Sequence, residues 1–236
     1  MGSNPKEAIG VTMIELVESL GTDATVVNAA RVSFDKQIDQ LRPKDEKLIL
    51  YLAQHKHYSP FRHLILQVRV EAPEFVMRQL YKHVVGIEAT SSHPTRDHAW
   101  NELSMRYTKM NDGAFHVPTI WRKQSEDNKQ GSDGVLEDSV QYKATRLYMN
   151  ALTTMTDTYN ALLEAGVAKE QARIILPLSV VTKVFWTVSF QAAMNFILLR
   201  DDDHAQKEIR ELAVDLRNIV AGLWPVSYKA WIEAHT

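Results

Sequence analysis

The stretch LILQVRVEAPEFVMRQLYKH, residues 64–83, carries most of the information about the fold. Leucine and valine occupy every second position from Leu64 to Val70, with mostly polar residues on the other face, and this alternation is typical of a half-buried strand. Pro73 suits the first position of a helix, because the amide hydrogen that proline lacks has no partner there. The stretch therefore predicts a strand followed directly by a helix from Pro73 to His83.

The same patterns predict further elements along the chain. We expect helices over residues 22–32, 44–55, 137–165, 168–176, 192–199 and 209–223, and a strand over 179–190. The longest helix should present Leu147, Ala151, Met155, Tyr159 and Leu162 on one side. Residues 85–100 and 123–135 are polar and without a period, which predicts loops. Helices without regular βαβ alternation predict a single α+β domain over residues 1–236.

Composition excludes several classes of function. The 236 residues include 27 Lys+Arg and 29 Asp+Glu, so the net charge of −2 predicts no global cationic field that would attract nucleic acid. The longest uncharged run, between Lys183 and Arg200, is shorter than the roughly 20 apolar residues of a membrane span. We therefore expect no membrane segment and a cytoplasmic protein. The chain contains no cysteine, which excludes disulfides, thiolate metal sites and a thiol nucleophile.

A few charged residues could carry chemistry. The run NELSMRY, residues 101–107, combines an acid, a hydroxyl and a guanidinium. Arg78 and Lys82 share a helical face, which is either a solvated basic face or an anion site. Arg173 and Arg200 border apolar runs, and because arginine is rarely buried unpaired, each should meet an acid or a ligand anion. For Arg200 that acid could lie in the following Asp201–Asp203 run. The histidines lack the HExxH spacing, so we expect no metal site.

Seven segments resemble, in order, the flavin-dependent thymidylate synthase family. They are AARVSF (29–34), HKHYSPFRH (55–63), APEFVMRQ (72–79), NELSMRY (101–107), ARIILPL (172–178), FWTVSFQAAMNFILLR (185–200) and DDHAQKEI (202–209). The resemblance implies a mixed sheet flanked by helices and a homotetramer whose sites are shared between subunits. It also implies the reductive methylation of dUMP to dTMP with FAD, methylenetetrahydrofolate and NADPH. The missing cysteine agrees, because the other class of thymidylate synthase activates uracil by thiolate attack.

The resemblance also implies roles for single residues. The dUMP-binding positions correspond to Arg78, Gln79, Glu102, Leu103, Ser104, Met105, Arg106, Arg173 and Arg200. The arginines would hold the phosphate through charge-assisted hydrogen bonds. Arg200 corresponds to the catalytic residue that orients uracil and stabilises negative charge developing on the ring.

The flavin-binding positions are carried over in the same way. They correspond to Ser33, His57, Ser59, Lys82, His83, Val84, Glu102, Ser189, Asn195 and His204. The family signature reads Arg-His-Arg, seven residues, then Ser. Here it reads Lys82-His83-Val84 with 19 residues before Ser104, an insertion of 12, so one cation is replaced and one is lost.

Two other functions remain open. One is a flavoprotein that acts on another pyrimidine nucleotide or takes a different one-carbon donor. The other is a catalytically silent nucleotide-binding homologue, which the replacement of arginine at positions 82 and 84 would favour.

Overall fold

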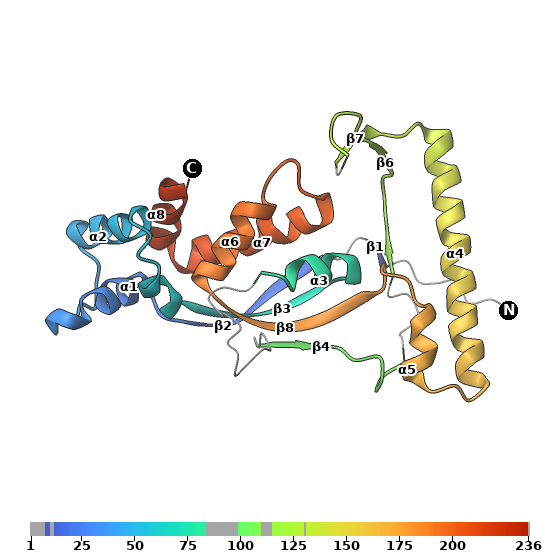
Figure 1. Cartoon of the computed structure of the whole chain (residues 1–236), viewed down its shortest axis with the longest axis horizontal. Helices are drawn as coiled ribbons and strands as arrows, with labels where there is room; N and C mark the ends of the chain where they lie inside the picture. The colour runs from blue at the N-terminus through green and yellow to red at the C-terminus, as the bar shows by residue number, and fades with distance from the viewer. Residues whose placement is uncertain (1–7, 10–11, 84–98, 110–114, 130, 236) are drawn as a thin grey trace, which may run out of the picture. The chain divides into compact units, whose positions relative to one another are not determined.

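The computed structural model describes residues 8–9, 12–83, 99–109, 115–129 and 131–235. The chain forms two compact units, each assembled from separate stretches. The first unit contains Met1–Thr12, Glu71–Arg78 and Glu102–Lys183, and the second contains Met13–Val70, Gln79–Asn101 and Val184–Thr236. The mixture of helices and strands confirms the α+β class (Figure 1). A single domain over residues 1–236 stays a prediction.

A four-stranded sheet has the order β2 (Met13–Leu20), β3 (Ile65–Pro73), β8 (Val181–Ser189) and β4 (Trp100–Glu102). Strands β3 and β8 run antiparallel, since the amide of Phe190 donates to the carbonyl oxygen of Leu64, and the amide of Glu74 donates to that of Val180. The predicted strands are confirmed. The aliphatic side chains at alternate positions from Leu64 to Val70 are fully buried, as the alternation required.

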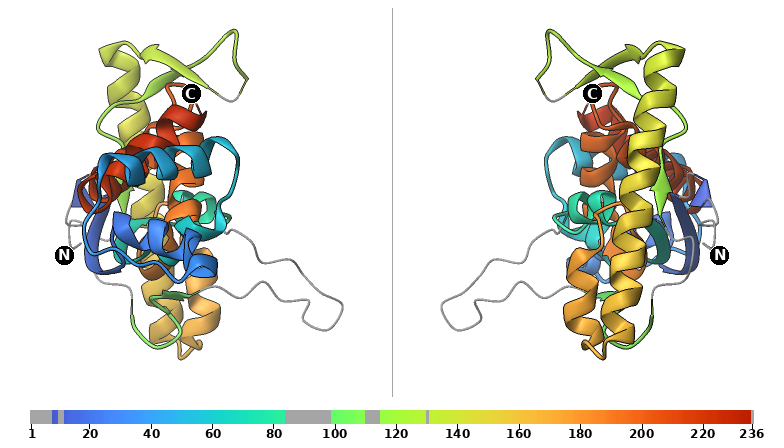
Figure 2. Two further views of the ribbon diagram at one scale, coloured as in Figure 1. Left: turned by 90° about the vertical axis from the view of Figure 1, so that its left-hand side faces the viewer. Right: turned by 90° about the vertical axis from the view of Figure 1, so that its right-hand side faces the viewer.

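The helices of the second unit pack around aromatic side chains. They are α1 (Asp23–Ala30), α2 (Pro43–Gln54), α6 (Phe190–Arg200), α7 (Lys207–Leu223) and α8 (Pro225–His235), with the short 3-10 helices η1 (Val32–Phe34) and η2 (Ser59–His63). Trp186, Phe190, Trp224 and Trp231 are almost completely buried, and α2 lies beside α8 (Figure 2). Four predicted helices are confirmed here, whereas α8 and β2 were not predicted.

The first unit contains the longest helix, α4 (Asp138–Glu164), together with α5 (Lys169–Ala172) and the 3-10 helix η3 (Arg173–Ile175). Both predicted helices are confirmed, and the predicted apolar stripe of α4 is exposed in its first half and buried or half-buried from Met155 onward. Leu147 is 59% exposed and Ala151 is exposed, while Leu152 and Tyr159 are buried. Leu152 packs with Phe115 and Val180, so the apolar partners in this unit bury a residue outside the expected stripe, whereas Tyr159 is buried as expected.

The loop predicted over residues 123–135 is largely a hairpin. Strands β6 (Arg122–Gln124) and β7 (Ser132–Val135) pair antiparallel. The side-chain amide of Gln124 donates to the carbonyl oxygens of Lys129 and Gly131, at 3.2 and 3.0 Å, and so orders the polar turn. A second strand pair, β1 (Ala8–Ile9) with β5 (His116–Val117), is parallel.

Helix α3 (Glu74–Leu80) is shorter than predicted, because the chain tightens into a turn in which the amide of His83 donates to the carbonyl oxygen of Leu80. The loop predicted over residues 85–100 lies almost entirely outside the described residues, and Trp100 already begins β4. Within the part of the chain that the structure describes, no helix is long and apolar enough to cross a membrane.

Candidate functional site

Helix α3 places Glu74 and Arg78 in the first unit. Pro73 ends β3, and the helix begins with the next residue. The amide of Glu74 donates to the carbonyl oxygen of Val180 at 2.8 Å, which ties the start of the helix to the chain just before β8. Arg78 follows one helical turn later on the same face as Glu74, and its side chain is exposed.

The NELSMRY run forms the end of β4 and the turn after it. The amide of Leu103 donates to the carbonyl oxygen of Lys183 at 2.9 Å, and the hydroxyl of Thr182 donates to Oε1 of Glu102 at 3.0 Å. After the strand, the backbone amide and Nε of Arg106 both lie 3.4 Å from the hydroxyl oxygen of Ser104. Strand pairing therefore positions Glu102, and a local turn positions Ser104 and Arg106.

A pair of carboxyl groups joins these two elements. The side chains of Glu74 and Glu102 are hydrogen-bonded to one another. Burial of Glu74, the charge of Glu102 and the hydrogen bond raise the pKa of Glu74 to about 6, although the positive charges of Arg78 and Arg173 oppose the rise. Four of the charged groups of this unit therefore lie together: two guanidinium groups beside two hydrogen-bonded acids.

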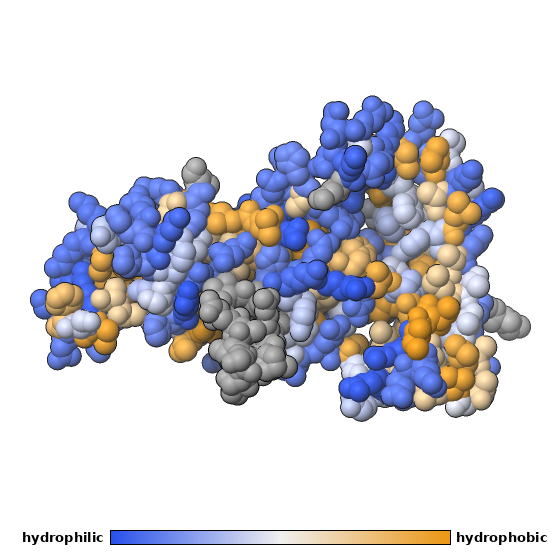
Figure 3. Space-filling view, viewed as in Figure 1, coloured by the Kyte–Doolittle hydropathy of each residue, from blue (hydrophilic) through white to orange (hydrophobic). Residues whose placement is uncertain are grey.

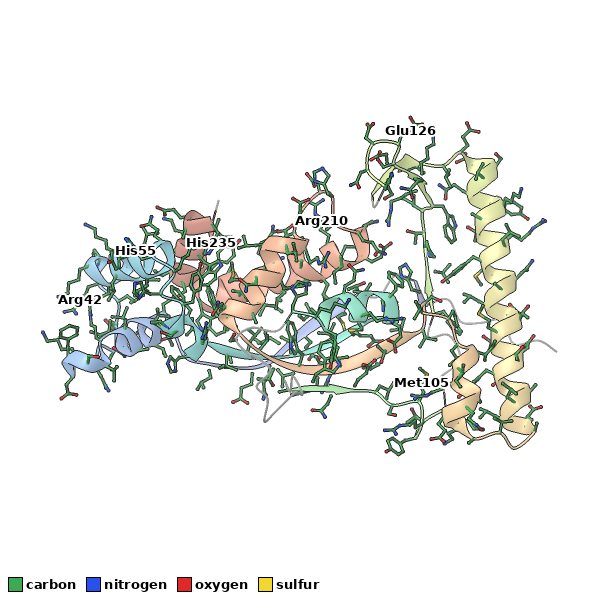
Figure 4. All side chains as sticks on the ribbon, in the orientation of Figure 1. Arg42, His55, Met105, Glu126, Arg210 and His235 are labelled. Atoms are coloured by element: carbon green, nitrogen blue, oxygen red, sulfur yellow. The ribbon has the colours of Figure 1, made fainter. Side chains whose placement is uncertain are left out.

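The remaining substrate positions of the first unit differ in their surroundings. The Arg106 guanidinium lies over the Tyr107 ring, 5.4 Å from its centroid. Met105, labelled in Figure 4, packs partly buried against the cluster of Phe115, Leu152 and Val180. Leu103 is 46% exposed. In this turn Arg106 is exposed, whereas Met105 anchors the turn to the core.

In the second unit, His83 and Arg200 are neighbours. Burial, together with the nearby charge of Arg200, lowers the pKa of His83 to about 4, so the imidazole is neutral at pH 7. The His83 ring also meets the edge of Phe196, with centroids 5.0 Å apart. Nε of Arg200 is buried and has no hydrogen-bond partner among the described residues.

The acidic run after Arg200 is engaged elsewhere. Asp201 pairs with Arg217, Asp203 pairs with Arg210 at 2.5 Å, and Asp202 accepts from the His204 amide at 2.8 Å. Arg210 extends from α7, where Figure 4 labels it. The prediction that one of these acids pairs with Arg200 is therefore not what the structure shows. Helix α7 supplies the partners of two of the three acids, which adjacency in sequence could not reveal.

Apart from Glu102, which belongs to the first unit, the other positions expected to bind a flavin lie in the second unit. Ser33, His57, Ser59, Lys82, Asn195 and His204 are exposed, and Ser189 caps α6 by accepting from the amide of Ala192 at 3.3 Å. Gln79, a predicted substrate position, donates to Oε1 of Gln206 at 2.9 Å. Val84 lies outside the described residues. No cluster of three metal-ligating side chains occurs in the described ranges.

Comparison with known proteins decides the family. Residues 15–226 match the family model described as "Thymidylate synthase complementing protein". The chain is 38% identical over 220 residues to the flavin-dependent thymidylate synthase of Thermosipho africanus, covering 93% of this chain and 90% of the relative. This chain belongs to the flavin-dependent thymidylate synthase family.

Other relatives of this thymidylate synthase family agree. The flavin-dependent thymidylate synthase of Thermus thermophilus is 36% identical over 93% of this chain and 75% of the relative. Among solved structures, the UMP/dUMP methylase PolB from Streptomyces cacaoi, bound with 5-Br dUMP, matches with a TM-score of 0.80 and 30% identity. That match covers 96% of this chain and 97% of the other.

Sequence reasoning missed two features of this family member. Glu74 was not singled out, although it precedes Arg78 by four residues and directly follows Pro73. Thr182 was also missed, because only strand pairing brings its hydroxyl to Glu102. The spacing of Glu74 and Arg78 was a signal available in the sequence, whereas nothing in the sequence joins Thr182 to a residue 80 positions away.

Proposed function

We propose that this chain methylates dUMP to dTMP as a flavin-dependent thymidylate synthase. The observation that carries the proposal is its similarity, over 96% of its length, to a UMP/dUMP methylase bound with 5-Br dUMP. Relatives named flavin-dependent thymidylate synthase support the same reaction. We further propose FAD as the flavin, NADPH as the reductant and methylenetetrahydrofolate as the one-carbon donor.

We assign recognition of the nucleotide phosphate to the arginines of the first unit. Arg78 and Arg173 lie beside Glu74, and Arg106 is exposed on the neighbouring turn. A guanidinium offers planar, charge-assisted hydrogen bonds that suit a phosphate. Ser104, in the same turn as Arg106, adds a hydroxyl that can orient the sugar or base.

We assign stabilisation of the uracil ring to Arg200. Its Nε is buried without a partner among the described residues, and an unsatisfied buried donor is costly unless a ligand accepts from it. A guanidinium stays protonated, so it can donate to a uracil oxygen on which negative charge develops. The neutral imidazole of His83 lies beside it and adds no competing positive charge.

The second unit contains groups that fit a flavin. Exposed hydroxyl, imidazole and ammonium groups at Ser33, His57, Ser59 and Lys82 can donate hydrogen bonds to phosphates and ring atoms. When bound, the flavin supplies the hydride chemistry that the side chains of this chain cannot. The protein residues bind, orient and stabilise charge.

We propose that the protein works as a homotetramer with sites shared between subunits. Apolar residues are gathered on the surface over α4 and α5 (Figure 3). On α4, Val140 is 40% exposed and Leu147, seven residues later on the same face, is 59% exposed. An apolar helix face of this kind suits contact with another subunit, and sedimentation would give the number of subunits. We also propose a cytoplasmic location, which suits a chain without cysteine.

The test is formation of dTMP from dUMP by the purified protein with FAD, NADPH and methylenetetrahydrofolate. The expected result is a yellow protein that makes dTMP, with no product formed when NADPH or methylenetetrahydrofolate is omitted. A protein that neither binds flavin in an absorbance titration nor makes dTMP would leave the silent-homologue alternative.

A second candidate substrate is UMP. The PolB methylase has also been solved bound with 5-Br UMP, with a TM-score of 0.80 to this chain. Comparing kcat/KM for UMP and dUMP distinguishes the two. Methylation of UMP at a rate similar to that of dUMP would establish the wider activity.

A further inference from the structure

Glu74 is a half-buried acid in the first unit that none of the assigned roles uses. Its position is set by the hydrogen bond from its amide to Val180, and Phe75 donates similarly to Leu178 at 3.1 Å. Arg78 shares its helix, and Arg173 faces it from η3. Glu74 is therefore held next to two of the arginines to which we assign the nucleotide phosphate.

Among the described charged groups around Glu74, Glu102 is the one acid. Glu102 faces it from the end of β4 and accepts a second hydrogen bond from Thr182. Lys183, next to Thr182 on β8, pairs with Glu71 at 2.9 Å, so its charge is already matched. Two carboxyl groups can share a hydrogen bond only when one of them holds a proton.

We propose that Glu74 is a positioning residue that shares a proton with Glu102 and thereby sets how much of the positive charge of Arg78 and Arg173 is available to the nucleotide phosphate. When the pair holds one proton, it carries a single negative charge against two guanidinium groups. When the proton leaves, two carboxylates neutralise the arginines and repel a phosphate. This inference rests on the proposed function, because it concerns the same nucleotide.

Phosphate binding should therefore take up a proton from solvent. A dianionic phosphate near Glu74 favours the protonated carboxyl, since like charges disfavour ionisation. By linkage, the affinity for dUMP then rises as the pH falls from about 8 to about 6, where Glu74 takes up its proton. Deoxyuridine, which lacks the phosphate, should bind equally well across that range.

The experiment compares wild type with Glu74→Gln, which keeps a hydrogen-bonding group of similar shape and never ionises. At about pH 8 we expect the variant to bind dUMP about fivefold more tightly, the size of one exposed charge interaction. At about pH 5, below the pKa of about 6 at which half of the Glu74 carboxyls are ionised, the two proteins should bind alike. The second pKa of the phosphate itself is near ~6, and because both proteins see the same nucleotide, the ratio of their dissociation constants removes it.

A matched control is Glu126→Gln, an exposed acid in the β6–β7 turn that Figure 4 labels. It should change neither dUMP affinity nor its dependence on pH. At saturating dUMP, kcat of the Glu74→Gln protein should stay near wild type while KM falls, which a merely structural role would not produce.

If Glu74→Gln fails to fold, calorimetry on wild type provides a second measurement. Titrations in two buffers of different ionisation enthalpy give the number of protons taken up when the ligand binds. At about pH 7.5 we expect net proton uptake with dUMP and none with deoxyuridine. Absence of uptake, or a Glu74→Gln protein with the pH dependence of wild type, overturns the inference. If wild type neither binds dUMP nor makes dTMP, the proposed function fails instead.

Discussion

Replacing Arg200 by alanine tests the centre of the proposed mechanism. The buried Nε of Arg200 has no partner among the described residues, whereas the neighbouring acids pair with Arg210 and Arg217. Removal of the guanidinium therefore breaks no ion pair in the described residues and leaves those of Asp201 and Asp203 in place. The fold should survive, and the change should appear in catalysis.

The expected size follows from the role. Loss of one electrostatic stabiliser of a developing anion typically costs about 10²–10³-fold in kcat, or roughly 2.7–4 kcal/mol. The free energy of unfolding should change far less. In addition, the pKa of His83 should rise from about 4 towards its ordinary value, because the charge of Arg200 is one cause of its depression.

The assay is dTMP formation at saturating dUMP and flavin, with FAD binding followed by absorbance and the His83 imidazole followed by NMR. Arg210→Ala is the matched control, since it removes a guanidinium from the adjacent helix that pairs with Asp201 and Asp203. That control should lose about 0.2–1 kcal/mol of stability and keep its rate. Turnover of Arg200→Ala within a few-fold of wild type would refute the role.

Three further predictions concern other residues. Arg173→Ala should weaken dUMP binding by about 1.5–3 kcal/mol, the loss of one charged hydrogen bond, while calorimetry with deoxyuridine shows little change; equal losses would exclude phosphate recognition. His83 has a folded pKa of about 4, below its ordinary 6.5, so the unfolded chain binds more protons between these values and stability falls as the pH drops through them. His83→Gln should flatten that part of the pH profile in urea titrations, and an unchanged profile would contradict the assignment. Asp23→Ala should lower the free energy of unfolding, measured by chemical denaturation, by about 1–3 kcal/mol, because the buried Asp23 carboxylate accepts from the amides of Val226 and Ser227 at the start of α8, at 3.2 and 2.8 Å. Asp23→Asn should lower it by less. An alanine variant as stable as wild type would show that the cap is dispensable.

The local sequence pattern was sufficient to predict an element where the spacing of its apolar residues alone decides which face is buried. The alternation from Leu64 to Val70 predicted β3 and its buried face, and the stripe from Ile209 to Val220 predicted α7. A period of two or 3.6 residues places apolar side chains on one face whatever the partner is. The family resemblance, carried by short segments in order, likewise did not depend on how the chain packs.

Sequence patterns failed where packing against a distant segment decides which residues are buried or where a helix begins. On α4, contact with Phe115 and Val180 buries Leu152, which lies outside the expected stripe. Strand β2 is exposed at most positions, so it has no alternation to detect. Helix α8 begins at Pro225, directly after α7, and the Asp23 carboxylate from a distant part of the chain caps the amides that follow this proline.

The candidate site divides in the same way. Residue types and their order determined the family, the absence of thiol chemistry and the arginines suited to a phosphate. Only the tertiary structure decided that Asp201 and Asp203 form ion pairs with α7 rather than with Arg200. It also decided that Glu74 is hydrogen-bonded to Glu102. The physical reason is that ionisation and pairing depend on burial and on charges brought from distant parts of the chain, which spacing along the sequence does not encode.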